Sequence, residues 1–387
     1  MSAGLVPRTD FLGLDADAVT HLYTAAECPM LGIAAAAMTE YAAWKSRAEA
    51  GRAHHREVTD SCKTRLAQLL GASTDEIALL GSASEAINAV AAAVDLEAGD
   101  NVVINDLEFP SVVLPWLRLR ERGIDVRLVR HQNWEIPTDL LLAAVDDRTR
   151  VVALSHVSYV NGWRHDVEAI STALRGTRTR FLLDATQTVG VLPVQAALAD
   201  FLVSSTYKWL LGTHGLGVLY VNRDTVGQPE PAAIGWFSLE TAFTEDRYER
   251  YRLRADAGRF ETGYLNFPAI YALNASVGYL LEIGVDRIAA HAHALGDELI
   301  AGLSGLGLTV TTPAVRARRG ASVTFLHERA AEIGQRLAAT GVYVWAGDGR
   351  VRASAHAFND SRDVERYLDA LTTVNDEQRA SARRVGG

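Results

Sequence analysis

Short apolar runs alternate with amphipathic stretches along the chain from about residue 60 onward. Runs of four to eight apolar residues bounded by turn signals, with helical patterns between several of them, are typical of a sheet buried on both faces. Seven such runs predict a large, mostly parallel seven-stranded α/β sheet that extends to about residue 250. They are residues 76–82, 101–109, 124–130, 150–158, 179–186, 199–206 and 216–222.

Helical patterns flank these runs. Residues 58–71 predict an amphipathic helix that is capped by Thr59 or Asp60 and ends at Gly71. Beyond residue 250, a long helical stretch over residues 268–303 leads into shorter elements. These are strand candidates at 308–313, 321–327, 342–347 and 350–356, and helices at 328–340 and 363–374. They predict a small α+β domain.

The pattern divides the chain of 387 residues into two domains, as its length suggests. We expect a large domain over residues 25–250 and a small domain made from residues 1–24 and 251–375. Residues 376–387 are polar and are expected to form a flexible tail.

Composition narrows the class of protein. Hydrophobic residues make up 48% and charged residues 22%, a balance typical of globular proteins. The net charge of −9 disfavours nucleic acid as a partner, and no apolar run approaches the roughly 18 residues of a membrane span. The first residues lack a signal-peptide layout. Two cysteines, Cys28 and Cys62, fit a reducing compartment and form no zinc pattern. We expect a cytoplasmic enzyme.

Lysine is rare in this chain. Of 38 basic residues, only Lys45, Lys63 and Lys208 are lysines. Lys45 and Lys63 lie in polar helical stretches, where solvent-facing positions are expected. Lys208 follows a strand and precedes Trp209 and a glycine-rich turn. In a half-buried aromatic setting its ammonium form is disfavoured, which makes the amine nucleophilic; an ordinary surface lysine is the alternative.

Further polar groups follow the ends of predicted strands, where ligands bind in open α/β sheets. Asp184 follows an apolar strand, and its carboxylate either caps the next turn or holds a cationic ligand. Several hydroxyls lie beside glycine or a helix start, where they either form a phosphate cup or serve as N-caps. They are Ser82, Ser84, Ser204, Ser205 and Thr206.

Taken together, a phosphate cup, a strand-end carboxylate and a lysine 24 positions later match the requirements of pyridoxal phosphate. The lysine binds this cofactor covalently, and the carboxylate keeps its pyridine nitrogen protonated. The ring can then withdraw electrons from the Cα atom of an amino acid.

Residues 182–194 and 199–221 resemble the class V aminotransferase family of pyridoxal-phosphate enzymes, of fold type I. The branch is that of cysteine desulfurases, cystine C–S lyases and isopenicillin N epimerase-like proteins. The similarity extends from residues 21–29 through 259–266 to 351–360.

The resemblance implies a role for each matching residue. Lys208 would hold the cofactor, Asp184 would pair with the pyridine nitrogen, and Gln187 would contact the phenolic oxygen. The phosphate would be held by Ala83 through its backbone and by Ser84, Ser205 and Tyr207.

The same resemblance implies further contacts. Gly263 and Tyr264 align with a segment that reaches the phosphate of the neighbouring subunit, which implies a homodimer with shared active sites. Arg352 matches the arginine that binds the substrate α-carboxylate in a bidentate manner. Ala26 is implied as a further substrate contact.

Three positions depart from the family pattern. Phe109 stands where a histidine usually stacks on the cofactor, and Tyr159 stands where asparagine is common, as a pocket residue or a packed aromatic. Residues 342–350 lack the catalytic cysteine of desulfurases, so persulfide formation is not expected. Cys28 is a poor substitute, and His156 is expected to be buried or to lie behind the site.

These features favour a C–S lyase that acts on cysteine, cystine or a cysteine S-conjugate by β-elimination. Transamination, decarboxylation with oxygen-dependent deamination, and epimerisation, with Tyr159 or Tyr23 as a second acid, stay open. A family member that serves only as a binding protein would be expected to lose Lys208 or Asp184, and both are present. No GxGxxG follows the first strand, which argues against a dehydrogenase.

Overall fold

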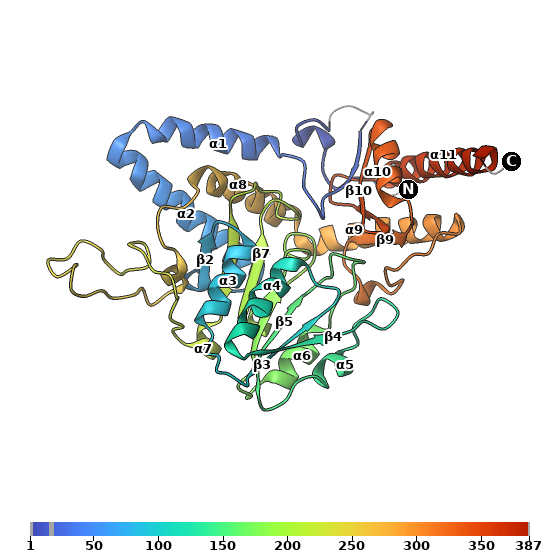
Figure 1. Ribbon diagram of the computed structural model, residues 1–387. Coiled ribbons are helices and arrows are strands. Elements are labelled where there is room, and N and C mark those ends of the chain that lie inside the picture. The colour runs from blue at the N-terminus through green and yellow to red at the C-terminus, as the bar shows by residue number, and fades with distance from the viewer. Residues whose placement is uncertain (1–2, 15–18, 386–387) are drawn as a thin grey trace.

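The computed structural model describes residues 3–14 and 19–385, with side chains described up to residue 374. Its larger sheet has seven strands in the order β2-β8-β7-β6-β5-β3-β4 (Figure 1). Only β8 is antiparallel to its neighbours, so the mostly parallel sheet predicted from the sequence is confirmed. The strands are β2 (Ile77–Leu80), β3 (Asn101–Asn105), β4 (Asp125–Val129), β5 (Thr149–Ser155), β6 (Arg180–Asp184), β7 (Phe201–Ser205) and β8 (Gly217–Val221).

Both faces of this sheet are buried. Successive strand residues point to opposite faces, so Leu182 and Leu183 of β6 lie in two different hydrophobic clusters. One cluster includes α3 (Ala83–Ala93) and α4 (Pro110–Leu119). The other includes α6 (Val167–Leu174) and a layer of long helices. The continuous apolar runs of the sequence follow from this double burial.

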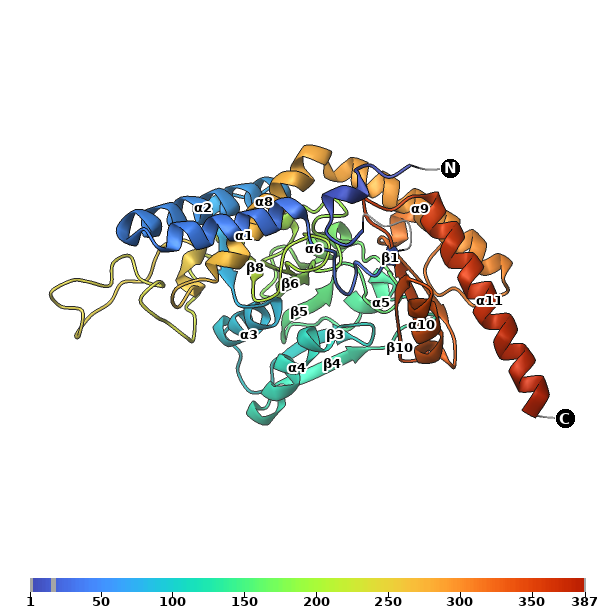
Figure 2. The ribbon, with the colours of Figure 1, turned by 90° about the horizontal axis from the view of Figure 1, so that it is seen from above.

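The layer of long helices consists of α1 (Gly32–Lys45), α2 (Ala48–Leu70) and α8 (Phe267–Ile283), which lie side by side (Figure 2). The predicted end of α2 at Gly71 is confirmed, because Gly71 adopts a left-handed conformation with φ of 62°. Its predicted start is wrong: Thr59 lies within the helix and its hydroxyl donates to the carbonyl of His55. Residues 48–57 are polar but compatible with a helix, and no local signal marks the true start of α2 at Ala48.

A second sheet has the strand order β1-β10-β11-β9. The predicted strands at 321–327, 342–347 and 350–356 are confirmed, whereas residues 308–313 form no strand, and Val310 makes a single isolated bridge with Phe325. The fourth strand comes from the N-terminal segment. The strands are β1 (Thr20–Leu22), β9 (Ser322–Leu326), β10 (Val342–Gly347) and β11 (Arg350–Ser354), covered by α9 (Val285–Gly305), α10 (Ala330–Ala339) and α11 (Ser361–Val385).

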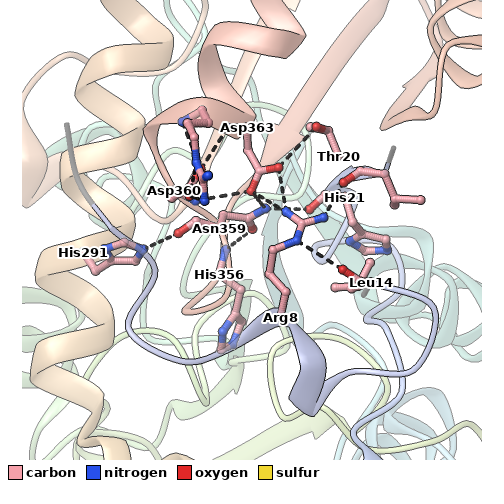
Figure 3. A network of polar contacts seen from close by, with 11 residues as sticks. Arg8, Leu14, Thr20, His21, His291, His356, Asn359, Asp360 and Asp363 are labelled. Carbon is pink, nitrogen blue, oxygen red and sulfur yellow. Dashed lines mark hydrogen bonds and ion pairs between the residues drawn. The ribbon is translucent and has the colours of Figure 1, made fainter. Parts of the chain in front are cut away.

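Polar contacts tie the N-terminal segment to the start of α11 (Figure 3). Arg8 Nη1 lies 2.9 Å from Asp363 Oδ1, and the hydroxyl of Thr20 donates to the same carboxylate. Asn359 Nδ2 donates both to Asp363 Oδ2 and to the carbonyl of His21. The small sheet thus contains strands from both ends of the chain. The buried carboxylate of Asp363 links these two ends.

Two features bear on the predicted domain limits. The α8 helix falls in the predicted small domain, yet its apolar side chains join the core of the large sheet with α1 and α2. The α11 helix runs to Val385, past the start of the predicted tail at residue 376; the flexibility of that tail stays a prediction. Within the described residues, none of the helices has the length and apolar character needed to cross a membrane.

The rare lysines differ in their surroundings. Lys45 is exposed, as predicted. The prediction for Lys63 is wrong: it is buried, and its Nζ lies 2.6 Å from Glu261 Oε1, which also accepts a hydrogen bond from the Leu79 amide. This ion pair joins α2 to β2 and to the segment that precedes α8. Its partner lies about 200 residues further along the sequence, so no local pattern indicated it.

Replacing Lys63 tests this ion pair. We expect Lys63→Met to lower the free energy of unfolding by about 3–5 kcal/mol, because the carboxylate of Glu261 is left buried without its cation. The matched control Lys45→Met, at an exposed helical position, is expected to change stability by less than about 0.5 kcal/mol. Urea unfolding of the three proteins measures the difference, and equal midpoints for Lys63→Met and the parent would contradict it.

Candidate active site

A cavity lies at the carboxyl ends of the parallel strands, where the sequence placed the candidate site. Ser155, Asp184 and Ser205 are the last residues of β5, β6 and β7, and all three line the cavity. The other lining residues come from the starts of α3 and α4 and from the loops after β3, β5, β6 and β7. They are Ser82, Ala83, Ser84, Phe109, Ser111, Tyr159, Thr186, Gln187, Tyr207 and Lys208.

Lys208 is 7% exposed, so the surface alternative is wrong. Its Nζ lies 5.5 Å from the ring centroids of both Phe109 and Tyr207. Burial lowers the pKa of this amine to about 8, helped by the positive charge of Arg352 and opposed by Asp184. The aromatic, water-poor setting predicted for Lys208 therefore gives a larger neutral fraction near neutral pH than an exposed lysine has.

Asp184 is buried, and its Oδ1 accepts a hydrogen bond from the Thr186 amide at 2.8 Å. The capping role that the sequence allowed is therefore confirmed for one oxygen. Burial raises the pKa of this carboxyl, whereas the hydrogen bonds from Thr186 and the charge of Lys208 lower it. Asp184 lines the cavity, so its carboxylate is placed to accept from a cationic donor there.

The start of α3 supplies backbone and hydroxyl donors. Ser82 is the N-cap and accepts from the Glu85 amide, whereas the Ser84 hydroxyl lies 2.6 Å from that of Ser111. A Cβ atom at Gly217 of β8 would lie 2.5 Å from the amide nitrogen of Ala83, so only glycine allows this close approach. The result is a cluster of hydroxyls and amides open to the cavity, which suits a phosphate.

The remaining hydroxyl candidates have mainly structural roles. Thr206 donates to the carbonyls of Thr213 and Leu216, and Ser204 donates to the carbonyl of Ser205. Neither of them lines the cavity, in contrast to Ser205. A hydroxyl next to glycine or a helix start was thus too weak a signal to separate residues that line the cavity from residues with structural roles.

Gln187 is held in one orientation. Its Nε2 donates to the carbonyl of Ala25 at 3.0 Å, and its Oε1 accepts from Trp209 Nε1 at 2.8 Å. One N–H of the amide stays available to the cavity. Ala26 follows in the same N-terminal segment but does not itself line the cavity with Lys208.

Arg352 is 3% exposed on β11 of the small sheet, and its Nη1 donates to the carbonyl of Tyr159. Burial and the neighbouring Arg350 lower the pKa of Arg352 to about 10. The ring of Tyr159 packs edge-on against Phe109 with a centroid separation of 5.1 Å. Tyr159 is therefore both a packed aromatic and a cavity residue, and it connects the two sheets at the site.

Both cysteines are protonated thiols at neutral pH. Cys28 Sγ donates to the carbonyl of Gly212 at 3.6 Å, and burial raises the pKa of its thiol to about 12. Cys62 is fully buried in α2, and burial likewise raises its pKa to about 12. Neither thiol is set up as a nucleophile, which requires the thiolate.

Other predicted residues lie away from the cavity. Gly263 and Tyr264 do not line it in this chain, and Tyr264 packs against Trp236 and Phe237. The role implied for them in a neighbouring subunit stays a prediction. His156 is buried, as predicted, in a separate cavity next to Arg164, and burial lowers its pKa to about 3.

Several residues at or beside the site have no distinctive signal in the sequence. Glu108 is buried next to Phe109, where it accepts hydrogen bonds from Asn105 and Ser155, and burial raises its pKa to about 7. Thr186 and Ser155 line the cavity. Glu108 and Thr186 lie near the ends of the predicted strand runs 101–109 and 179–186, and that position was the only available signal.

The family of the chain is now clear. The model of the class V aminotransferase family matches residues 26–367. The chain belongs to this family and is an enzyme of it, with the fold of the pyridoxal-phosphate enzymes of fold type I.

Individual relatives agree with this assignment. A probable cysteine desulfurase of Methanothermobacter thermautotrophicus is 36% identical over 247 residues, which cover 63% of this chain and 61% of that protein, less than two thirds of its length. The solved apo structure of a cysteine desulfurase from Thermococcus onnurineus superimposes with a TM-score of 0.86 at 25% identity, over 95% and 96% of the two chains. The cystine C–S lyase C-DES in complex with cysteine persulfide shares the fold, with a TM-score of 0.85 at 21% identity over 93% and 98%.

Family membership implies pyridoxal phosphate as the cofactor, and the cavity fits it. A buried carboxylate that lines the cavity suits a pyridinium nitrogen, and a buried amine of lowered pKa suits the aldehyde. The hydroxyl and amide cluster at the start of α3 suits the phosphate.

The low pKa of Lys208 predicts how the apoprotein takes up this cofactor. The neutral amine is the reactive form, so the uptake rate is expected to rise about tenfold per pH unit below pH 8 and to level off above it. Arg352→Met is expected to move this inflection to higher pH, since it removes a nearby positive charge. Nα-acetyllysine, titrating near its ordinary value, is the control. An inflection near 10.5 in the protein would contradict the prediction.

Proposed function

We propose that this enzyme is a pyridoxal-phosphate-dependent lyase that cleaves a C–S bond by β-elimination from cysteine, cystine or a cysteine S-conjugate. One observation carries the proposal. Residues 342–350 contain no cysteine, and the two cysteines of the chain, half-buried Cys28 and buried Cys62, have thiols of raised pKa. Thiols of raised pKa are poor acceptors of sulfur, which supports a reaction in which the sulfur leaves as part of a small-molecule product.

The relatives support C–S chemistry on a cysteine-derived substrate. Two of them are named cysteine desulfurases, and a third is named a cystine C–S lyase. Of these activities, elimination needs no protein thiol. Elimination is therefore the activity among those of the relatives that the residues of this chain support best.

The cofactor would be held by the residues that line the cavity. Asp184 would accept from the pyridinium nitrogen, Gln187 would donate to the phenolic oxygen, and Phe109 would pack against the ring. Ala83 through its amide, with the hydroxyls of Ser84, Ser205 and Tyr207, would bind the phosphate. When bound, the cofactor supplies an electron sink for the electrons of the substrate Cα–H bond.

The side chains then bind the substrate and move one proton. Arg352 binds the α-carboxylate, and Tyr159 fixes the orientation of Arg352 through its carbonyl. The neutral form of Lys208 Nζ would accept the proton from Cα. The electron pair left at Cα forms the Cα–Cβ double bond as the Cβ–S bond breaks and the thiolate departs. Hydrolysis of the product gives pyruvate and ammonia.

A homodimer is part of this proposal. Residues 227–256 extend away from the body of the molecule (Figures 1 and 2). This segment and the adjacent turn carry exposed aromatic side chains, and such clusters favour a protein partner. They are Trp236, Phe243, Tyr248, Tyr251 and Tyr264. We propose that a second copy covers them and that its Gly263 and Tyr264 approach the phosphate, in the cytoplasm, where cysteine thiols stay reduced.

Transamination is the second candidate, because an uncharacterised aminotransferase of Bacillus subtilis is 26% identical over 81% of this chain. It would use the same cofactor and substrate contacts, but no bond at Cβ would break, and the proton held by Lys208 would be returned so that the amino group stays with the cofactor. Product analysis therefore separates the two reactions.

The decisive experiment incubates the purified holoenzyme with cystine, several cysteine S-conjugates and ordinary amino acids. A lyase is expected to release pyruvate, ammonia and the sulfur-containing fragment in equal amounts, a thiol from an S-conjugate or a persulfide from cystine, while its visible absorbance persists over many turnovers. An oxo acid that retains the substrate side chain, formed together with pyridoxamine phosphate, would instead establish an aminotransferase.

Removal of the thiols provides a second test. Cys28→Ser and Cys62→Ser are both expected to retain sulfur release within about twofold, since neither thiol acts as a nucleophile. Trapping with iodoacetamide during turnover is expected to find no persulfide on either cysteine. Loss of at least 100-fold in Cys28→Ser alone, with the protein still folded, would instead assign a persulfide mechanism to Cys28.

A further inference from the structure

A second buried arginine lies beside Arg352. Arg350 and Arg352 are alternate residues of β11, so their side chains lie on the same face of the strand. They are 7% and 3% exposed. The guanidinium groups of Arg350 and Arg352 lie 4.7 Å and 5.3 Å from the ring centroid of Trp345 on the neighbouring strand.

The positive charge of this pair is poorly compensated. Nε and Nη2 of Arg350 and Nε of Arg352 are buried and make no hydrogen bond within the described residues. The acidic neighbour of Arg350 is Asp348, whose Oδ2 lies 3.5 Å from Nη2 and whose side chain is 71% exposed. Two buried guanidinium groups without buried anions are unfavourable, because each positive charge repels the other. An anionic ligand bound beside them would offset this repulsion.

Arg350 is connected to the active site through aromatic rings. Its guanidinium lies 5.3 Å from the ring centroid of Tyr159, which lines the cavity of Lys208. Tyr159 in turn packs on Phe109, whose ring centroid is 5.5 Å from Lys208 Nζ. Neither arginine lines this cavity itself, but both contact Tyr159, which does. A substrate bound at Arg352 therefore has a second cation in contact with the same tyrosine.

We propose that Arg350 binds an anionic group on the side chain of the substrate, so that the substrate carries a distal carboxylate or similar oxyanion besides its α-carboxylate. The inference rests on the proposed function and specifies its substrate class. One α-carboxylate offsets the charge of Arg352 and leaves that of Arg350. Cystine, or an S-conjugate that carries an acidic group, meets the requirement, whereas S-alkyl cysteines do not.

Matched pairs of ligands test the subsite. S-carboxymethylcysteine and S-carbamoylmethylcysteine have nearly the same shape and differ by one charge, and the corresponding ethyl pair extends the reach. Titration of the holoenzyme, followed by its visible absorbance, is expected to show about 10- to 100-fold tighter binding of the acidic member in at least one pair. A ratio near one in both pairs would overturn the proposal, whether or not any variant folds.

Variants assign the preference to one residue. Arg350→Gln is expected to bring the ratio close to one while it changes the affinity for the neutral ligands by less than about threefold. Arg350→Lys is expected to keep part of the preference. Arg352→Gln, the matched control, is expected to weaken both members of a pair equally. If Arg350→Gln weakened both members equally, Arg350 would serve only to position Tyr159 and Arg352, and the proposal would fail.

The outcome is independent of the type of reaction. Glutamate and glutamine form a third pair that differs by one charge. This pair can be titrated whether the enzyme is an aminotransferase or a lyase. A preference for the acidic members together with oxo-acid products would keep the subsite and refute the lyase. Pyruvate release with no charge preference would keep the lyase and refute the subsite.

Discussion

Two opposite charges at the ends of neighbouring parallel strands define the site. Asp184 ends β6, and Lys208 follows the end of β7. Burial disfavours the charged form of both groups, while the charge of each one favours ionisation of the other. The carboxylate lines the cavity, and the amine, with its pKa lowered to about 8, has a larger neutral fraction near neutral pH than an exposed lysine has. This pairing provides both an acceptor for a pyridinium nitrogen and a nucleophilic amine in one cavity, which is the chemical basis of the proposed function.

The rest of the fold holds this pair in place and surrounds it with complementary groups. Gly217 brings β8 close to the start of α3, and the bonds of Gln187 to Ala25 and Trp209 fix the N-terminal segment against the cavity. The small sheet, closed by the contacts of Asp363 with the N-terminal segment (Figure 3), contributes Arg350 and Arg352. Asp184 and Lys208 thus come from the large sheet and the two arginines from the small sheet.

Features with a local signal were predictable from the sequence, and features that depend on distant partners were not. The seven strands of the large sheet were predicted because burial on both faces makes each one a continuous apolar run. The β1 strand was missed because three residues have no pattern of their own and pair with β10, more than 300 residues away. The burial of Lys63 depends on Glu261, and the place of Arg350 depends on Tyr159 and Trp345, so neither could be distinguished from surface residues. Asp184 and Lys208 were recognised because their spacing matches a known family motif.

The most direct measurement is to identify the lysine that carries the cofactor. Reduction of the holoenzyme with borohydride fixes pyridoxal phosphate to its lysine, and mass spectrometry of the peptides then locates it among the three lysines of the chain. The account predicts a phosphopyridoxyl group on Lys208 and on neither Lys45 nor Lys63. A protein that carries the group elsewhere, or that carries none while it remains active, would contradict it.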